Sequence, residues 1–238
     1  VTLWAHQWVF LAVLLSVALL CFREFSDIIT KHGFDRPGPI GYAAGVAVVL
    51  VRNHELLLVT VLAVLAMTLA LRAKELVRAL PGAAAFLLGV VYVFGCWRFA
   101  AALRVVNPHW LLFTLALTWI GDTGAYYVGS AIGKHKLAPR LSPGKSWEGT
   151  VASVVVSALF GFIYLGAFLP EVAPAWRIGL AVTGNIAGQV GDLAESAIKR
   201  GAGVKDSGNL LPGHGGWLDR VDSTLFALPV VYGLLQLM

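Results

Sequence analysis

Acidic residues gather near the C-terminal end of the chain, between Gly191 and Asp222. Five of the thirteen Asp and Glu residues fall in this stretch of 32 residues, although only 13% of the chain is charged. The segments on either side are apolar enough to lie in a bilayer. Ionisable side chains at membrane depth are costly to keep, so they indicate a functional site by default. This stretch is therefore the first candidate for a site.

Two of these acids, Asp192 and Asp219, are hard oxygen ligands on either side of a glycine-rich loop. Mg²⁺ prefers one or two protein carboxylates together with substrate phosphates and waters. Nearby basic residues suit the phosphates of a metal-bound triphosphate; they are Lys199, Arg200, Lys205 and Arg220. In phosphoryl or nucleotidyl transfer, such groups position the reactants and neutralise developing negative charge.

The loop also holds residues with weaker signals. His214 stands in the sequence GHGG, which is typical of a tight turn, and a lone histidine there is more often a turn residue than a catalyst. Asp222 lies three residues after Asp219. The two either share a helical face or Asp222 caps the helix that follows, and both interpretations stay open.

A second basic stretch runs from residue 121 to residue 149. Its candidate phosphate ligands are Lys134, Lys145, Ser142 and Ser146, with Lys136 and Arg140 close by. Lysine and arginine donate charge-assisted hydrogen bonds to phosphate, and glycine lets backbone N–H groups approach it closely. The SPGKS sequence is not a Walker A motif, because the required spacing fails. By itself, the stretch fits an ordinary basic cytoplasmic loop equally well.

Polar side chains also lie inside two apolar segments. Asp122 stands in the segment 110–130, and Asn185, Gln189 and Asp192 lie at successive spacings of four and three residues. The latter three share one face of a helix, which cannot face lipid and must line a protein interior or a water-filled cavity. For Asn185 and Gln189, an inter-helix hydrogen-bond network and a functional role are equally favoured. For Asp192, with Glu195 three residues on, function is favoured.

The elements that must position these residues are membrane helices. Hydrophobic residues make up 58% of the chain, and the mean hydropathy is +0.77, which is far from the range of soluble domains. Crossing a hydrocarbon core of about 30 Å takes roughly 20 apolar residues. We predict an all-α, polytopic membrane protein with about eight transmembrane helices. The segments are 4–22, 38–51, 56–71, 81–97, 110–130, 149–168, 177–198 and 223–238.

The distribution of basic residues predicts the orientation. If all eight segments cross, 14 of the 18 Lys and Arg residues lie in the connections on one side, which are 23–37, 72–80, 131–148 and 199–222. Cytoplasmic connections carry an excess of such residues. The two long polar connections are therefore predicted to be cytoplasmic, with Val1 and Met238 outside.

Chemistry divides the chain into two parts. Residues 1–109 hold four apolar segments whose charges lie almost wholly at their ends, as packing and topology require. Residues 110–238 hold the unusual polar residues and form the predicted catalytic region, with cytoplasmic loops at 131–148 and 199–222. The basic residues are dispersed among membrane ends, which argues against nucleic-acid binding. The two cysteines lie in apolar segments and give no disulfide framework.

The sequence SAIKRGAGVKDSGNLLPGHGGWLDRVD, residues 196–222, resembles the signature of the bacterial type of phosphatidate cytidylyltransferases, also called CDP-diacylglycerol synthases. The elements of the pattern occur in order and at the expected spacing. They are Ser196, Lys199-Arg200, Lys205-Asp206, His214-Gly215-Gly216 and Asp219-Arg220-Val221-Asp222. The upstream sequences GDTGAYYVG, GKHKLAP and SPGKSWEG also resemble the family. The resemblance is highly specific and covers essentially the whole chain.

The resemblance implies cytidylyl transfer from CTP to phosphatidic acid, giving CDP-diacylglycerol and pyrophosphate in phospholipid biosynthesis. Asp192 and Asp219 would hold the divalent metal, expected to be Mg²⁺, with a second cation left open. The implied catalytic residues are Asp192, Asp219, Lys199, Arg200, Lys205, His214 and Arg220. The implied ligands of the nucleotide and its metal are Asp122, Lys134, Ser142, Lys145, Ser146, Lys205, Asp206 and Asp222.

The resemblance also sets the expected surroundings. The protein would be a multi-pass protein of the inner, cytoplasmic membrane, in contact with membrane lipids, with its active site facing the cytoplasm; a homodimer is implied by the resemblance alone. Family members usually carry a further hydrophobic segment before the one that opens this chain, so a ninth, N-terminal helix is expected to be missing here. Gly144 stands where a basic residue is common, which puts the contribution of that position to phosphate binding in doubt.

Other functions stay open on the residues themselves. A related lipid nucleotidyltransferase or a lipid kinase, acting on another phospholipid or a polyprenol, would use the same groups. A cation or proton-coupled transporter would use Asp122, Asp192 and Glu195 as an intramembrane relay. The transporter explains neither the long basic loop nor the asymmetric halves, and no inverted repeat is evident.

Overall fold

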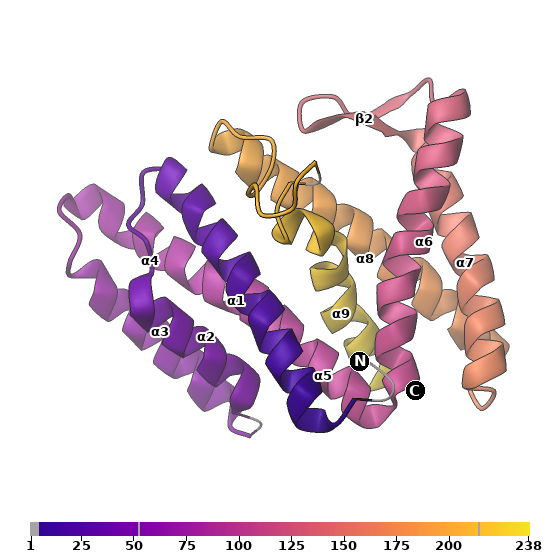
Figure 1. The fold of residues 1–238 in the computed structure, drawn as a ribbon, viewed down its shortest axis with the longest axis horizontal. Helices are drawn as coiled ribbons and strands as arrows, with labels where there is room; N and C mark the ends of the chain where they lie inside the picture. The colour runs from indigo at the N-terminus through magenta and orange to yellow at the C-terminus, as the bar shows by residue number, and fades with distance from the viewer. Residues whose placement is uncertain (1–4, 52, 214) are drawn as a thin grey trace. The chain divides into compact units, whose positions relative to one another are not determined.

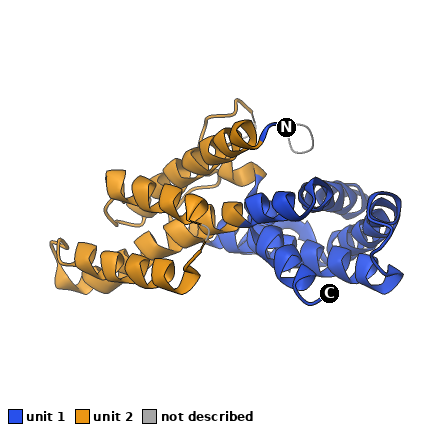
Figure 2. Ribbon diagram, turned by 90° about the horizontal axis from the view of Figure 1, so that it is seen from below, with its two compact units in different colours: residues 1–6, 99–197, 221–238 blue, residues 7–98, 198–220 orange. Residues whose placement is uncertain are grey.

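The computed structural model describes residues 5–51, 53–213 and 215–238. These residues form helices along most of the chain, joined by short connections and a small β-hairpin (Figure 1). They divide into two compact units, coloured separately in Figure 2. Unit 1 comprises residues 1–6, 99–197 and 221–238, and unit 2 comprises residues 7–98 and 198–220.

Unit 2 is built mainly from the N-terminal helices. Its elements are α1 (Gln7–Lys31), α2 (Gly38–Leu50), α3 (Glu55–Ala70), η1 (Leu76–Arg78), α4 (Ala79–Gly89), the π-helical turn η2 (Val90–Gly95) and η3 (Leu218–Arg220). Helix α1 packs against α2, α4, η2 and η3. Phe22, Phe25 and Phe94 are fully buried in this core. Gly45 lies so close to the ring of Phe94 that an added Cβ would overlap it, so the missing side chain lets the elements approach.

Unit 1 holds the C-terminal helices. Its elements are α6 (Pro108–Ile132), β1 (Lys136–Ala138), β2 (Ser142–Ser146), α7 (Trp147–Phe168) and α9 (Asp222–Leu235); α5 (Cys96–Val106) and α8 (Pro174–Gly201) contribute residues to both units. Helices α6 and α7 pack along each other, and α6 also contacts α9. Asn107 caps α6 and Ser146 caps α7, each accepting a hydrogen bond from a backbone N–H of the first turn.

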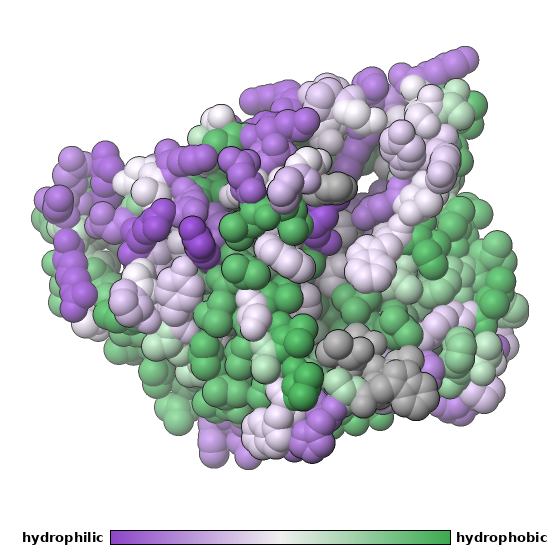
Figure 3. Space-filling model, viewed as in Figure 1, coloured by the Kyte–Doolittle hydropathy of each residue, from purple (hydrophilic) through white to green (hydrophobic). Residues whose placement is uncertain are grey.

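The helices have the length and surface of membrane spans. The ranges 7–31, 76–106 and 147–168 are long and apolar enough to cross a bilayer, and α2, α3 and α9 are shorter apolar helices. On α7, Val151, Val155, Leu159 and Ile163 form an exposed stripe at a spacing of four residues, as expected of a lipid-facing surface. Figure 3 shows hydrophobic residues covering much of the helical surface. The prediction of an all-α, polytopic membrane protein is confirmed, whereas the count of eight crossings stays a prediction.

The helices extend beyond several of the predicted apolar segments, and one predicted connection contains a hairpin. Helix α1 continues nine residues beyond the predicted end at residue 22, because Phe25, Ile28 and Ile29 extend its buried face. The predicted loop 131–148 contains the antiparallel hairpin β1–β2, which pairs Lys136 with Ser146. Helix α8 runs to Gly201, so Lys199 and Arg200 lie in its last turn. Basic residues in the last turn of a helix complement its dipole.

Replacing Gly161 with alanine should destabilise unit 1. The new Cβ would lie 2.4 Å from the Cβ of Ala181 and 3.1 Å from the carbonyl oxygen of Arg177, so α7 and α8 would have to separate. Overpacking of this kind costs about 1–3 kcal/mol, which should lower the thermal unfolding temperature in detergent. Gly179→Ala is the matched control, because no atom lies within 4 Å of its added Cβ. Equal unfolding temperatures for the two variants would contradict this packing.

Candidate active site

Asp219 organises the glycine-rich loop of unit 2, residues 202–217, which joins α8 to η3. Its Oδ2 accepts hydrogen bonds from the backbone N–H of Ser207 at 2.9 Å and of Gly216 at 2.8 Å. Its Oδ1 accepts one from Lys199 Nζ at 2.5 Å, an ion pair whose two side chains are each 9% exposed. One carboxylate thus holds the loop at two points, Ser207 and Gly216, and also the last turn of α8.

These partners determine the charge of Asp219. Burial alone would raise the pKa of this carboxyl, but the hydrogen bonds from Lys199, Gly216 and Ser207 outweigh it and lower the pKa below its usual value of 3.8. A carboxyl group whose pKa is lower in the folded than in the unfolded protein contributes to folding stability, and this contribution is complete at pH values above the unfolded pKa. The stabilisation is lost only as the pH falls through the lower, folded value. The carboxyl group of Asp219 is therefore ionised at neutral pH.

Glu24 of α1 is a residue of this site that the sequence reasoning missed. It is 2% exposed, and its Oε2 accepts hydrogen bonds from Ser207 Oγ and from the backbone N–H of Leu218, both at 2.8 Å. Its Oε1 accepts a third from the N–H of Trp217 at 3.0 Å. The apolar periodicity continuing through Phe25 and Ile28 was the available signal, since it places Glu24 on the buried side of a longer helix.

The glycines of the loop make room for these two carboxylates. Gly215 has a φ of +78°, which L side chains rarely adopt, and an added Cβ would lie 2.6 Å from Oδ2 of Asp219. An added Cβ on Gly216 would lie 2.3 Å from Oε2 of Glu24. The Gly-Gly pair of the signature is therefore explained by the close approach of backbone to carboxylate.

A second carboxylate–lysine pair lies in unit 1. Lys145 Nζ of β2 lies 2.6 Å from Oδ2 of Asp192 on α8, and each side chain is 27% exposed. Asp122 of α6 interacts electrostatically with Asp192, Asp222 and Lys145. These four predicted residues, from three helices and the hairpin, therefore form one charged cluster with three acids and one base. The structure brings them together although Asp122 and Asp222 are 100 residues apart.

Asn185 and Gln189, two residues of the polar stripe on α8, belong to a hydrogen-bonded network. Asn185 donates to Ser153 Oγ and Ser157 Oγ of α7, both at 2.9 Å, and its Oδ1 accepts from Gln189 Nε2 at 2.7 Å. An added Cβ on Gly121 of α6 would lie 2.3 Å from Asn185 Nδ2. Asn185 thus ties α7 to α8.

The hairpin positions the predicted residues of the upstream stretch. Ser146 is buried and accepts a hydrogen bond from the N–H of Gly149 at 3.2 Å, so its hydroxyl serves as the helix cap. Lys145, the preceding residue, points to Asp192 because successive side chains of a strand alternate between faces. Ser142 is half-buried in β2, and Lys134 is exposed before β1.

The other predicted residues of the loop lie at its surface or outside the described ranges. Lys205, Asp206 and Arg220 are exposed in unit 2. Arg200 is exposed and donates to the carbonyl oxygen of Val204 at 3.3 Å. His214 falls outside the described residues. Asp222 is buried as the first residue of α9 and accepts from the N–H of Ser223, which is compatible with either predicted role.

The carboxylate of Asp192 is better placed to bind a divalent cation than that of Asp219, because its oxygens have fewer hydrogen-bond partners. Among the described residues, no group of three or more His, Cys, Asp and Glu side chains is arranged to hold a metal by itself. Asp192 has Lys145 on one oxygen and a long, 3.4 Å hydrogen bond from Ser196 on the other. Both oxygens of Asp219 accept backbone hydrogen bonds. Oxygens from a bound substrate would have to complete such a site.

Fold and site together define an α-helical, polytopic membrane protein that carries carboxylate–lysine pairs on α8 and η3. The chain matches the model of the cytidylyltransferase family over residues 1–238. It belongs to this family.

Several curated relatives are named phosphatidate cytidylyltransferase. The one from Bacillus subtilis (strain 168) is 40% identical over 154 residues, which cover 63% of this chain and 57% of the relative. Those from Staphylococcus haemolyticus (strain JCSC1435) and Staphylococcus aureus (strain COL) are 42% identical over 154 and 156 residues, which cover 64% of this chain and 59% of each relative. The chain thus spans less than two thirds of the length of the relatives it matches.

Replacing Glu24 with glutamine should loosen the glycine-rich loop. The amide keeps the shape of the side chain but presents an NH₂ group to one of the three donors, leaving that donor without a partner. Hydrogen–deuterium exchange of peptides covering residues 205–220 should speed up by about tenfold, which corresponds to the roughly 1–3 kcal/mol cost of an unsatisfied group. Glu171→Gln, at an exposed glutamate of unit 1, is the control and should leave this exchange unchanged. Unchanged exchange in Glu24→Gln would contradict the positioning role.

Proposed function

We propose that the protein transfers a cytidylyl group from CTP to phosphatidic acid, forming CDP-diacylglycerol and pyrophosphate. The observation that carries the proposal is the match to the cytidylyltransferase family over the whole chain. The names of its relatives support phosphatidate as the acceptor. The carboxylate–lysine pairs Asp192–Lys145 and Asp219–Lys199, with the basic residues of the loops, supply the groups that such a transfer needs.

In the proposed step, an oxygen of the lipid phosphate forms a bond to the α-phosphorus of CTP. The bond from that phosphorus to the oxygen that bridges it to the β-phosphate breaks, and pyrophosphate leaves with the electron pair. The lipid phosphate is already ionised near neutral pH, so no general base is required. The main task of the protein is to orient two anions that otherwise repel each other.

Basic residues would perform most of that task. Lys199, Arg200, Lys205 and Arg220 would bind phosphate groups from unit 2, while Lys134, Lys145 and Ser142 would contact the nucleotide from the hairpin. Lys145 and Lys199 are each held by a carboxylate. Binding of an anion beside either pair would let the lysine share its donors with phosphate.

The proposal includes Mg²⁺ at Asp192 and Asp219, with Asp122 close to Asp192; a second cation is compatible with it. When bound, the cation would neutralise phosphate charge and favour departure of pyrophosphate. Three acids with one lysine around Asp192 are a suitable environment for such an ion. Asp219 would bind it only by sharing oxygens that now accept hydrogen bonds from the loop.

The proposed location is the inner membrane, with the site open to the cytoplasm. CTP is a soluble, cytoplasmic molecule, whereas phosphatidic acid has two acyl chains that remain in the bilayer. A site at the membrane surface meets both demands, and the excess of basic residues in the connections 131–148 and 199–222 supports the orientation. A homodimer is proposed on the family resemblance alone.

Purified protein with CTP, Mg²⁺ and phosphatidic acid should release pyrophosphate, and omission of the lipid should abolish the release. The measurement is an enzyme-coupled pyrophosphate assay in detergent micelles. Release with another lipid phosphate, but none with phosphatidic acid, would replace the acceptor. Ion flux in proteoliposomes without pyrophosphate release would favour a transporter.

Replacing Asp192 with asparagine should raise the Mg²⁺ concentration for half-maximal activity at least tenfold and lower kcat by 10²-fold or more, because it removes a charged metal ligand. Asp219→Asn should abolish activity, since it also removes the partner of Lys199. Asp27→Asn is the control, because Asp27 likewise pairs with a basic residue, Arg36. Wild-type Mg²⁺ dependence in Asp192→Asn would rule out this carboxylate as a metal ligand.

A further inference from the structure

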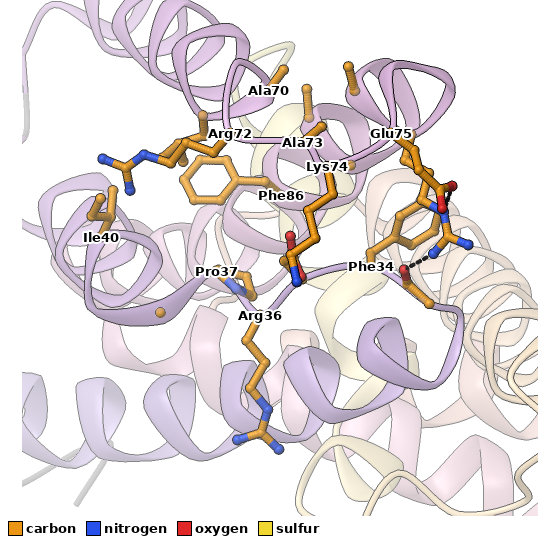
Figure 4. A pocket seen from close by; sticks show the side chains of 18 of the residues that line it. Phe34, Arg36, Pro37, Ile40, Ala70, Arg72, Ala73, Lys74, Glu75 and Phe86 are labelled. Atoms are coloured by element: carbon orange, nitrogen blue, oxygen red, sulfur yellow. Dashed lines mark hydrogen bonds and ion pairs between the residues drawn. The ribbon is translucent and has the colours of Figure 1, made fainter.

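A pocket of about 390 Å³ lies in unit 2, among residues that play no part in the proposed reaction (Figure 4). It is lined by the connection between α1 and α2, the first turn of α2, the connection between α3 and η1, and one side of α4. The ring of Phe86, which is 5% exposed, forms part of its wall.

The lining of the pocket is rich in basic side chains. They are Arg36, Arg72, Lys74 and Arg78, set against the acids Asp35 and Glu75. Arg36 is paired with Asp27, and Arg78 with Glu75 and the carbonyl oxygen of Gly33. Within the described ranges, the side chains of Arg72 and Lys74 have no hydrogen bond or ion pair. Figure 4 shows Lys74 reaching into the middle of the pocket and Arg72 extending toward Ile40, whereas Arg36 points away.

The first turn of α2 adds donors to the same space. Gly38, Pro39 and Ile40 line the pocket; Pro39 has no N–H, so Gly38 and Ile40 are the backbone donors, and no side chain caps this helix. Uncapped N–H groups and the positive end of the helix dipole favour an anion, and phosphate is a common ligand of such ends. Two uncommitted cations and a helix N-terminus therefore line one cavity, and among the described lining residues Asp35 is the acid without an ion pair.

The surroundings of the pocket indicate where the anion comes from. Leu71, Leu76, Val77 and Leu80, which precede or follow the basic residues in the chain, are between 78% and 88% exposed. Large apolar side chains interspersed with Lys and Arg are typical of the membrane interface, where the apolar groups meet acyl chains and the cations meet headgroups. The same connections, 23–37 and 72–80, are predicted to be cytoplasmic.

We propose that this pocket binds the headgroup phosphate of an anionic phospholipid as an accessory lipid, with Arg72 and Lys74 as the principal ligands. The lipid is neither substrate nor product of the proposed reaction, and the site does not depend on that proposal. Arg72 and Lys74 would contact the phosphate, the first turn of α2 would donate backbone N–H groups, and the exposed leucines would contact the acyl chains.

Native mass spectrometry of the detergent-solubilised protein tests the proposal. Phosphatidylglycerol should bind with higher affinity than phosphatidylcholine of the same acyl chains. The double variant R72Q/K74Q should bind phosphatidylglycerol roughly 30-fold more weakly, since each basic residue at a membrane surface contributes about a fivefold factor. R23Q/K31Q removes one exposed Arg and one exposed Lys of the same unit outside the pocket, and should change binding less than twofold.

Two further measurements distinguish lipid binding from misfolding of the variant and from binding of free phosphate. Asp35→Asn should strengthen binding of phosphatidylglycerol, a gain that misfolding would not produce. Inorganic phosphate, titrated in place of lipid, should compete only at millimolar concentrations. Equal binding by R72Q/K74Q and wild type, equal loss in R23Q/K31Q, no preference over phosphatidylcholine, or tight binding of inorganic phosphate would each overturn the proposal.

Discussion

A carboxylate held beside a bilayer keeps its charge only if the protein supplies its partners, because hydrocarbon offers none and a buried loop admits little water. The arrangement of this protein follows from that constraint. Asp219 and Glu24 are surrounded by donors from the glycine-rich loop, and Asp192 has Lys145. The loop must therefore bend its backbone toward the two carboxylates, which it does through Gly215 and Gly216.

The same partners suit the proposed reaction. The lysines that pair with these carboxylates are held in place by them, so under the proposed function little reorganisation would accompany binding of the phosphates of a substrate. The surroundings of Asp192 and Asp219 differ, which suggests different roles for the two carboxylates. The acids around Asp192 outnumber their single lysine, which favours a cation, whereas Asp219 is fully engaged in holding the loop and Lys199. Under the proposed function, the acids around Asp192 would provide most of the metal environment.

The sequence was sufficient to predict the helices, because their positions depend on local, repeated patterns of apolar residues. Each of the eight apolar segments corresponds to a helical region, because runs of apolar residues leave few alternatives beside lipid. Glu24 was not predicted as a site residue, because its partners Ser207 and Leu218 are 183 and 194 residues away and no spacing rule connects them. Ser146, whose role as a ligand stays a prediction, also caps α7, a contact that was not predicted because the sequence alone does not show which N–H a serine faces. The hairpin was not predicted, because three of the five residues of β2 are proline, glycine and lysine, which are uncommon in strands.

The most direct test of the proposed function follows the phosphorus atoms of CTP. The protein would be incubated with phosphatidic acid, Mg²⁺ and CTP labelled with ³²P at either the α or the γ position, and the lipid would then be extracted and counted. Cytidylyl transfer predicts that the α-label enters the lipid and that the γ-label is recovered in pyrophosphate. Transfer of the γ-label to the lipid would show a kinase, and a lipid that carries neither label would contradict the proposed function altogether.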